Sequence, residues 1–531
     1  MAVSLRKSVA ILLCLLLNSP VFGQFGVFKG KDKDKAKESE PAKGDKPPEY
    51  SEKEKKKLEE IAQRQDVKDL IEATWEEVRR NDMNQAYVIN TFTGFRDNSG
   101  NAQAVQFLNE YGVVYDNPIL QNYVNSLGQR LVPKDSPNLY AFRLLLDPVP
   151  RAEALTTGTI YLSTGLVSLL DNEAQLSYVV AHEIAHVERN HRYNEIRQKV
   201  LEEKLDEEKE KDAAKKALLT GLVGAGLGAA VGGLAGGGKG AGTGTMIGAL
   251  AGLVTGSIAY RNRFKQTNWN VVNEDEADET GLRLMLAQKY DAREIPKTYT
   301  RLETLISRDA RLGLGFMGHP KRVKARINHI KTLLEGLLKA DVDRVVKEGA
   351  VGSTPNFSLL MAALKRDNGI AALDYDLFPM ARDNLEDALA IRSSDPRAHY
   401  YLGKVMAQTG RDAAEKQQAA NHFLKAIQYD SQRGSYPEPH LQKALFLIDQ
   451  NNRSNQEEIR GELKTYVTLY QREHAGSLPS NMHIIYDYFL LSGENSFYAP
   501  PVTNISTRDI SPVSVQTTPG APDSSKAVKK N

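Results

Sequence analysis

The sequence predicts a mainly α protein: an α+β catalytic domain with a small sheet, followed by an α-helical repeat domain at the C-terminal end. Apolar residues recur at helical spacing in several long segments. A short strand-like stretch near residues 151–166 precedes a helix that carries two histidines. Near the other end, the pattern of 385–389 recurs at 423–427. A length of 531 residues suggests two or three domains.

Composition excludes several classes of protein. The chain has 69 Lys+Arg against 67 Asp+Glu, a net charge of +2, which argues against a nucleic-acid binder. A mean hydropathy of −0.44 rules out a polytopic membrane protein. Because Cys14 is the one cysteine, the chain forms no internal disulfide and no cysteine-cluster metal site. Any bound metal must be held by His, Asp or Glu.

Residues 1–23 are predicted to be a secretory signal peptide. Arg6 and Lys7 precede an apolar run, residues 8–17, that is too short to span a bilayer, and residues 21–23 resemble a cleavage site. A lipoprotein acceptor role for the cysteine is the weaker alternative, because a bulky leucine precedes it. We therefore expect an exported protein.

Two segments are predicted to lie outside the folded domains. Residues 24–57 are rich in Lys, Glu, Asp and Pro, which is typical of a solvated linker, and residues 496–531 form a disordered tail. From about Lys56 to Arg80, apolar residues at helical spacing predict an amphipathic helix that leads into the catalytic domain, residues 58–335.

The segment Ala181–Val187 contains the pattern His-Glu-x-x-His and continues an apolar helical run. On a helix, His182 and His186 project from one face, so their neutral imidazoles can hold one zinc ion. Glu183 lies next to the first histidine, where its carboxylate can take a proton from a metal-bound water. The alternative is a helix with two histidines by chance, which is uncommon with 10 histidines in the chain.

A catalytic zinc normally has three protein ligands and one open position, so a third ligand is required. Downstream, Glu274 and Asp278 lie one helical turn apart and share a face. One can bind the metal while the other accepts the free N–H of a ligand histidine. The alternative for this segment is an acidic helix start favoured by the helix dipole. The sequence thus predicts one Zn²⁺ per chain.

These paired motifs resemble the gluzincin zinc peptidases, and more narrowly the HtpX/BepA-like branch related to CaaX prenyl proteases. Residues 151–166 resemble the family's edge strand, residues 116–131 its entry helix, and Gly318-His319-Pro320 with Arg326-Ile327 its late His-Pro…Arg-Ile element. The resemblance covers roughly residues 110–335. Arg151 departs from it, because the family usually has Asn at that place.

The resemblance also implies roles for individual side chains. It assigns Glu274 to the zinc, with Glu276 as the alternative ligand, and it assigns Asp278 to the orientation of His182. It makes Glu183 the general base that activates water for attack on a peptide carbonyl.

A tetrahedral oxyanion needs a further donor. By resemblance, His319 and Arg326 are the candidates. In some relatives the matching histidine reaches the zinc instead, so His319 is alternatively an inhibitory fourth ligand. His191, five residues past His186, is predicted to be a solvated or capping residue, because that spacing turns it away from the metal face.

The strand Thr157–Thr164 is predicted to be the edge strand that receives the substrate. An extended peptide that pairs with its backbone is held independently of side-chain identity, which favours unfolded substrates. The candidate substrate-binding residues are Gly158, Thr159, Ile160, Tyr161 and Leu162.

Residues 217–260 form an unusual insertion in the catalytic domain. They carry one charge, Lys239, and a glycine at every fourth position from Gly224 to Gly256. This stripe predicts a membrane-inserting or oligomerising helical hairpin, since each arm is long enough to span a bilayer. The alternative is a mobile glycine-rich loop over the active site.

Residues 350–495 are predicted to be a tetratricopeptide-like repeat domain that offers a concave surface to a client or assembly partner. The alternative is a plain helical bundle packed on the catalytic domain.

The combined hypothesis is an exported, membrane-associated zinc metalloendopeptidase of the bacterial periplasm, acting on unfolded or misassembled envelope proteins; the choice of substrates rests on the resemblance. The alternative is a zinc-containing chaperone or assembly factor with gated proteolysis.

Overall fold

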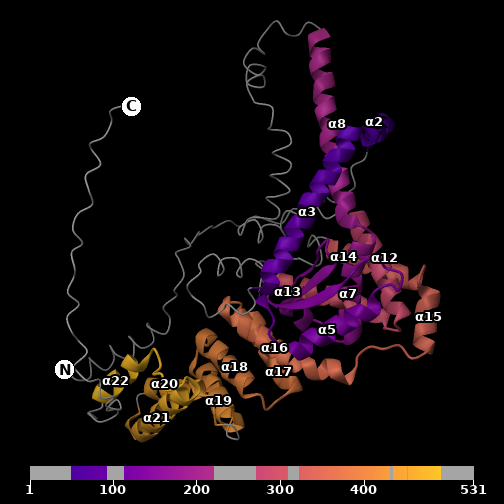
Figure 1. Cartoon of the computed structure of the whole chain (residues 1–531). Helices are drawn as coiled ribbons and strands as arrows, with labels where there is room; N and C mark the ends of the chain where they lie inside the picture. The colour runs from indigo at the N-terminus through magenta and orange to yellow at the C-terminus, as the bar shows by residue number, and fades with distance from the viewer. Residues whose placement is uncertain are drawn as a thin grey trace, which may run out of the picture. The chain divides into compact units, whose positions relative to one another are not determined.

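The computed structural model describes residues 50–91, 113–219, 271–308, 322–430, 434–450 and 452–491. The predicted signal peptide, the C-terminal tail, His319 and all but the first three residues of the glycine-rich insertion lie outside these ranges. The described residues fall into two compact units that divide between Gly434 and Ser435, and each is described by itself. Helices dominate both, so the prediction of a mainly α protein is confirmed (Figure 1).

The first unit contains one sheet of four described strands: β1 (Val113–Val114), β2 (Ala141–Leu146), β3 (Ala152–Ala154) and β4 (Thr159–Ser163). The strand order is β1-β2-β4-β3. Strand β2 pairs in parallel with β4, while the β1–β2 and β3–β4 pairs are antiparallel. The edge beyond β4 is therefore occupied by β3.

This order corrects the prediction that Thr157–Thr164 is an edge strand. The chain reverses at Gly158, whose φ of 79° lies in the left-handed region, so β3 and β4 form a hairpin. An added Cβ on Gly158 would also collide with the carbonyl oxygen of Leu139. Strand β4 is thus paired on both sides, and the edge strand of the hairpin is β3.

One face of the sheet packs against α5 (Pro118–Leu131) and α7 (Glu173–Glu188). Helix α5 is the predicted entry helix, capped by Asn117 and started by Pro118. Gly128 lets α5 approach the ring of Phe142 on β2, because a Cβ there would lie 2.4 Å from the ring.

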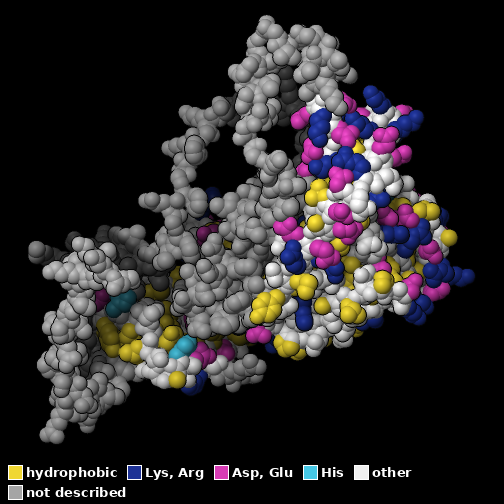
Figure 2. Space-filling model, turned by 45° about the horizontal axis from the view of Figure 1, so that its top comes forward, with side chains coloured by type: hydrophobic (Ala, Val, Ile, Leu, Met, Phe, Trp, Pro, Cys, Tyr) yellow, Lys and Arg dark blue, Asp and Glu magenta, His cyan; other side chains and the backbone are white. Residues whose placement is uncertain are grey.

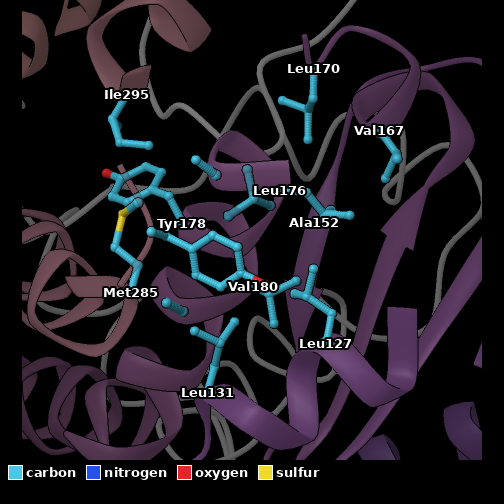
Figure 3. Close-up of a cluster of buried hydrophobic side chains, with 14 of the residues drawn as sticks. Leu127, Leu131, Ala152, Val167, Leu170, Leu176, Tyr178, Val180, Met285 and Ile295 are labelled. Carbon is cyan, nitrogen blue, oxygen red and sulfur yellow. The ribbon is translucent and has the colours of Figure 1, made fainter. Parts of the chain in front are cut away.

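The remaining helices of this region close the core around α7. They are α6 (Thr164–Ser168), α12 (Val271–Ala287), η3 (Ala292–Glu294), α13 (Ile295–Arg308), α14 (Val323–Glu335) and α15 (Lys339–Lys347). Leu131 from α5, Tyr178 from α7 and Met285 from α12 are among the side chains that meet in this core (Figure 3). Residues on all sides of α7 are buried, so the helix is fixed in position along most of its length.

Three further helices pack together: α2 (Glu52–Gln63), α3 (Gln65–Thr91) and α8 (His191–Leu219). The single helix predicted from about Lys56 to Arg80 is instead two helices, because α2 ends at Gln63 and α3 starts at Gln65. Helix α2 begins at Glu52, within the predicted linker, because Ser51 and Glu54 form a reciprocal capping box. Ile196, Val200 and Leu205 of α8 pack against α2 and α3. Lys and Arg intermingle with Asp and Glu over this group (Figure 2). None of the helices within the described ranges is long and apolar enough to cross a membrane.

Helices α16 (Pro355–Asp374), α17 (Phe378–Ile391), α18 (Pro396–Thr409) and α19 (Ala413–Asp430) pack as two successive pairs. The recurring segments 385–389 and 423–427 lie on α17 and α19, the second helix of each pair. This arrangement is compatible with the tetratricopeptide prediction, which stays a prediction.

Helix α16 is part of the same buried core as α7. Its Phe357, Met361 and Leu364 belong to the same buried cluster as α7. Its Lys365 donates to the carbonyl oxygen of Ser168 at 2.7 Å. For this reason the compact units divide at Gly434 rather than near residue 350.

The second unit contains α20 (Glu438–Asp449), η5 (Arg453–Asn455), α21 (Gln456–Glu473) and α22 (Met482–Leu491). Leu463 and Val467 of α21 pack with Ile485 and Phe489 of α22 in its own apolar core.

Acid is expected to destabilise the α18–α19 pair through His422. Its Nδ1 lies 2.9 Å from Nδ1 of His399, and burial together with the charge on His399 lowers the pKa of His422 to about 4. The unfolded chain protonates this histidine near its ordinary pKa of about 6.5. The contribution of His422 to the free energy of unfolding is therefore fully present above pH 6.5, and it is lost as the pH falls toward 4.

The measurement is the melting temperature of wild type and His422→Asn at pH 7.5 and 5.0. The variant should lose less stability than wild type over this interval. An equal loss in both proteins would contradict the prediction.

Candidate metal centre

The two histidines of the motif lie on α7 and face the first turns of α12. Helix α7 is capped by Asn172, whose side chain accepts from the backbone N–H of Gln175. Helix α12 crosses α7 closely at Gly281, where an added Cβ would lie 3.0 Å from the backbone nitrogen of His182. This close approach brings Glu274, near the start of α12, to the histidines of α7.

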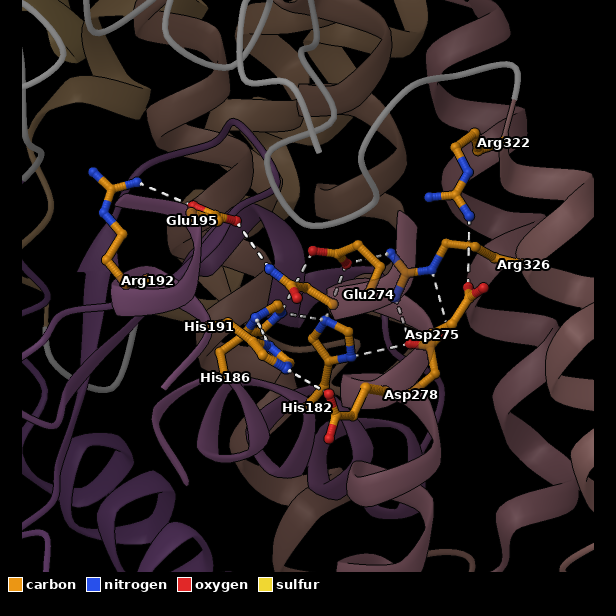
Figure 4. Close-up of polar contacts among 12 residues, drawn as sticks. His182, His186, His191, Arg192, Glu195, Glu274, Asp275, Asp278, Arg322 and Arg326 are labelled. Atoms are coloured by element: carbon orange, nitrogen blue, oxygen red, sulfur yellow. Dashed lines mark hydrogen bonds and ion pairs between the residues drawn. The ribbon is translucent and has the colours of Figure 1, made fainter. Parts of the chain in front are cut away.

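The structure brings the three predicted ligands together. Nε2 of His182 lies 3.1 Å from Nε2 of His186 and 3.4 Å from a carboxylate oxygen of Glu274 (Figure 4). The other oxygen of Glu274 lies 3.6 Å from Nε2 of His186. Ligands that surround a metal tetrahedrally at 2.0–2.1 Å are about 3.3 Å apart. The spacing and the chemistry of these donors therefore fit a zinc ion.

The site is buried on one side and open on the other. His182 is 1% exposed and Glu274 is 3% exposed, whereas the side chain of His186 is 21% exposed. Among the residues that the structure describes, these three form the one group of metal-ligating side chains found within reach of a single ion. Glu276 is not part of the group, so the geometry favours Glu274 over the alternative ligand.

Asp278 holds the second nitrogen of His182, as the resemblance implies. Its Oδ1 lies 3.0 Å from Nδ1 of His182 and accepts from the hydroxyl of Tyr178 at 2.6 Å. Burial raises the pKa of Asp278, but the positive charge of Arg326 and the bond to His182 outweigh it and hold that pKa far below its usual range. Asp278 is therefore ionised and fixes the ring of His182.

The electrostatics of the ligands follow from the same contacts. Burial lowers the pKa of His182, but its hydrogen bonds to Asp278 and Glu274 outweigh burial and raise it to about 9. Burial raises the pKa of Glu274, yet the charges of His186 and Arg326 and the bond to His182 bring it down to about 2. Glu274 is therefore a carboxylate, as a metal ligand must be.

Arg326 differs from its predicted role as a donor to the oxyanion. The side chain is fully buried, its Nη1 lies 3.2 Å from Glu274, and its Nε donates to Asp278 at 3.1 Å. Nη2 contacts the same aspartate, and the guanidinium lies 5.0 Å from the ring centroid of Tyr299. These contacts direct Arg326 at the ligand carboxylate of Glu274 and at Asp278, where it positions both groups and balances their charge.

Glu183 is 6% exposed and follows the first ligand histidine on α7. Burial raises its pKa to about 7, and the negative charges of Glu274 and Glu153 act in the same direction. A carboxylate with a pKa near neutrality is suited to both accept and return a proton. The general base implied by the motif thus has a suitable environment.

The structure corrects the prediction that His191 is solvated and turned away from the metal face. It is 2% exposed, and its Nδ1 lies 2.9 Å from Nδ1 of His186. A five-residue spacing turns a side chain away only if the helix continues, but α7 ends at Glu188 and α8 starts at His191. Two residues lie between the helices, and the second of them, Asn190, has a φ of 53°. Asn at a helix end is the signal that could have indicated this turn.

Gly281→Val is expected to destabilise the protein by about 1–3 kcal/mol, because overpacking at this crossing must move α12 away from α7. Zinc affinity should fall as well, since Glu274 moves with α12. Urea unfolding and zinc titration measure the two effects. Gly461→Val on α21 is the control, because an added Cβ there meets nothing within 4 Å. The same small change at both glycines would contradict this account of the crossing.

Comparison with known proteins agrees with this geometry. Residues 116–334 match the family model described as peptidase family M48. The chain is 37% identical over 81 residues to the beta-barrel assembly-enhancing protease of Yersinia pestis and 38% identical over 78 residues to that of Escherichia coli (strain K12). These alignments cover 15% and 14% of this chain, and the chain spans about 16% of the length of each relative.

One solved structure, the human IFIT1 dimer with PPP-AAAA, aligns with 62% of this chain and 80% of its own at 15% identity. The TM-score of 0.18 is too low for this alignment to support any statement about the fold.

Proposed function

Because residues 116–334 match the model of peptidase family M48, we propose that the chain is a zinc metalloendopeptidase that cleaves unfolded or misassembled proteins of the bacterial envelope. The observation that carries the proposal is the convergence of His182, His186 and Glu274 at 3.1–3.6 Å, with Glu183 beside them. The family match and the donor geometry both support metal-dependent hydrolysis.

The reaction follows from the roles of the side chains. His182, His186 and Glu274 would hold the metal, which when bound acts as a Lewis acid on the scissile carbonyl and lowers the pKa of water. Glu183 accepts a proton from the attacking water as the carbon–oxygen bond forms. It then gives that proton to the amine nitrogen as the carbon–nitrogen bond breaks.

The edge strand β3 is the proposed place for the substrate backbone. Strand β3 pairs with β4 on one side. Its other side has no pairing strand among the described residues, so β3 forms an edge of the described sheet. Helix α7, which carries His182 and His186, packs against β3. A peptide that adds to this edge would be extended, so unfolded chains are the expected substrates.

Export and membrane association complete the proposal. They rest on the sequence pattern of residues 1–23 and of 217–260, and the names of the relatives support an envelope role. Carbonate extraction of membranes from cells that express the chain with and without residues 217–260 tests the membrane part. Full release of the intact chain into the wash would refute insertion.

The test of the enzymatic proposal uses the purified chain and casein as an unfolded substrate. Cleavage should stop when a chelator removes the metal and should return when Zn²⁺ is added in excess. His319→Ala is included because the resemblance makes His319 either a donor to the oxyanion or an inhibitory ligand. Absence of cleavage in all samples, together with protection of casein from aggregation, would favour the chaperone alternative.

A further inference from the structure

His191 and His186 make a contact that the three-ligand site does not require. Helix α7 closes with hydrogen bonds from the N–H of Arg189 to Ala185 and from the N–H of Asn190 to Val187. The left-handed conformation of Asn190 then turns the chain so that the first residue of α8 points back at α7. The His191 ring stands nearly perpendicular to the His186 ring, with 4.9 Å between centroids.

The proton positions in this contact follow from the metal geometry. His186 faces the other two ligands through Nε2, so its proton resides on Nδ1. The 2.9 Å separation of the two Nδ1 atoms then requires that His186 donates and His191 accepts. The proton of His191 is consequently on Nε2, which lies 3.4 Å from a carboxylate oxygen of Glu276.

The same turn also contacts the helix that carries the third ligand. Nε of Arg189 lies 3.4 Å from Glu276, and Nδ2 of Asn273 lies 3.5 Å from Glu195 on α8. Asn273 and Glu276 flank Glu274 in the sequence of α12. The start of α8 therefore touches one ligand histidine directly and holds the segment that presents the ligand carboxylate.

We propose that His191 is a positioning residue for the metal: it fixes the Nδ1–H tautomer and ring angle of His186, and Glu276 in turn orients His191. The partner of His182 is the carboxylate of Asp278. The partner of His186 is the neutral imidazole of His191, which in turn contacts the carboxylate of Glu276. Such outer partners of metal-binding histidines typically change metal affinity about 10–100-fold. This inference rests on the proposed metal site and concerns the arrangement of its second histidine.

The experiment measures Zn²⁺ affinity of the metal-stripped full chain by competition with a chromophoric chelator. His191→Leu keeps the apolar bulk and removes the acceptor, so its dissociation constant should rise about 10–100-fold. His191→Asn places an oxygen close to the position of Nδ1 and should recover most of that loss. The absorption spectrum of the Co²⁺-loaded chain should change in the leucine variant and return toward wild type in the asparagine variant.

His399→Leu is the matched control. His399 is also a buried histidine, 5% exposed, and its Nδ1 also lies 2.9 Å from a histidine Nδ1, that of His422, but this pair is on α18 and α19. Its zinc affinity and Co²⁺ spectrum should equal those of wild type. The melting temperature of each metal-free variant verifies folding, and if the leucine variant is unfolded the asparagine variant is compared with His191→Ala.

A folded His191→Leu that binds Zn²⁺ as tightly as wild type, with the same Co²⁺ spectrum, would overturn the proposal. So would an equal loss in the leucine and asparagine variants, because it would show that the acceptor is irrelevant. Failure of the metal site itself looks different, since wild type would then bind no zinc either.

Discussion

Glu183→Gln is expected to reduce peptide hydrolysis by about 10²–10⁴-fold, the usual contribution of a general base. The amide keeps the size of the side chain and cannot accept the proton of the attacking water. Zinc content should stay as in wild type, because the three ligands are unchanged. Initial rates on casein and metal analysis of the same sample measure both quantities.

The control for this variant is Glu279→Gln. Glu279 lies on α12 with the ligand Glu274, but it is partly exposed and pairs with Arg283 at the surface. It should retain wild-type activity. Full activity of Glu183→Gln, at normal zinc content, would remove the carboxylate from the mechanism and leave the proposed proton transfer without a base.

Arg326→Met is expected to lower the free energy of unfolding by about 3–5 kcal/mol, the range seen when one partner of a buried ion pair is removed. The guanidinium is fully buried and contacts both Glu274 and Asp278. Without it, two carboxylates remain close together with less compensating charge. Urea unfolding of the metal-free protein gives the change directly.

Arg322→Met is the comparison variant. Arg322 lies one turn before Arg326, at the start of α14. Arg322 lies 3.5 Å from Asp275, and its side chain is 12% exposed. Its loss should cost about 1 kcal/mol or less, as for pairs that solvent reaches. Equal urea midpoints for the two variants would show that Arg326 does not balance the buried carboxylates.

The regular geometry of helices explains which parts of the site could be predicted from the sequence. A spacing of four residues fixes the relative directions of His182 and His186, and of Glu274 and Asp278, wherever each helix lies. Because a catalytic zinc needs a third protein ligand, an acidic residue of the second pair is expected to lie close to the two histidines. The structure adds the close crossing at Gly281, which no spacing in the sequence reveals.

The remaining features depend on where elements end and how they pair. The role of His191 depends on a helix that stops at Glu188, and the hidden position of β4 depends on the reversal at Gly158. Arg326 shows the same limitation, because its two partners lie on another helix. In each case the deciding contact is tertiary, while the sequence pattern specifies the local conformation alone.

Metal analysis of the natively purified chain by mass spectrometry, beside Glu274→Ala prepared in parallel, is the most direct test of the metal centre. We predict about one zinc per chain in wild type, consistent with a single three-ligand site, and a much lower content in the variant. A wild-type protein without a divalent metal, or a Glu274→Ala protein that holds as much as wild type, would contradict the joint binding of one ion by His182, His186 and Glu274.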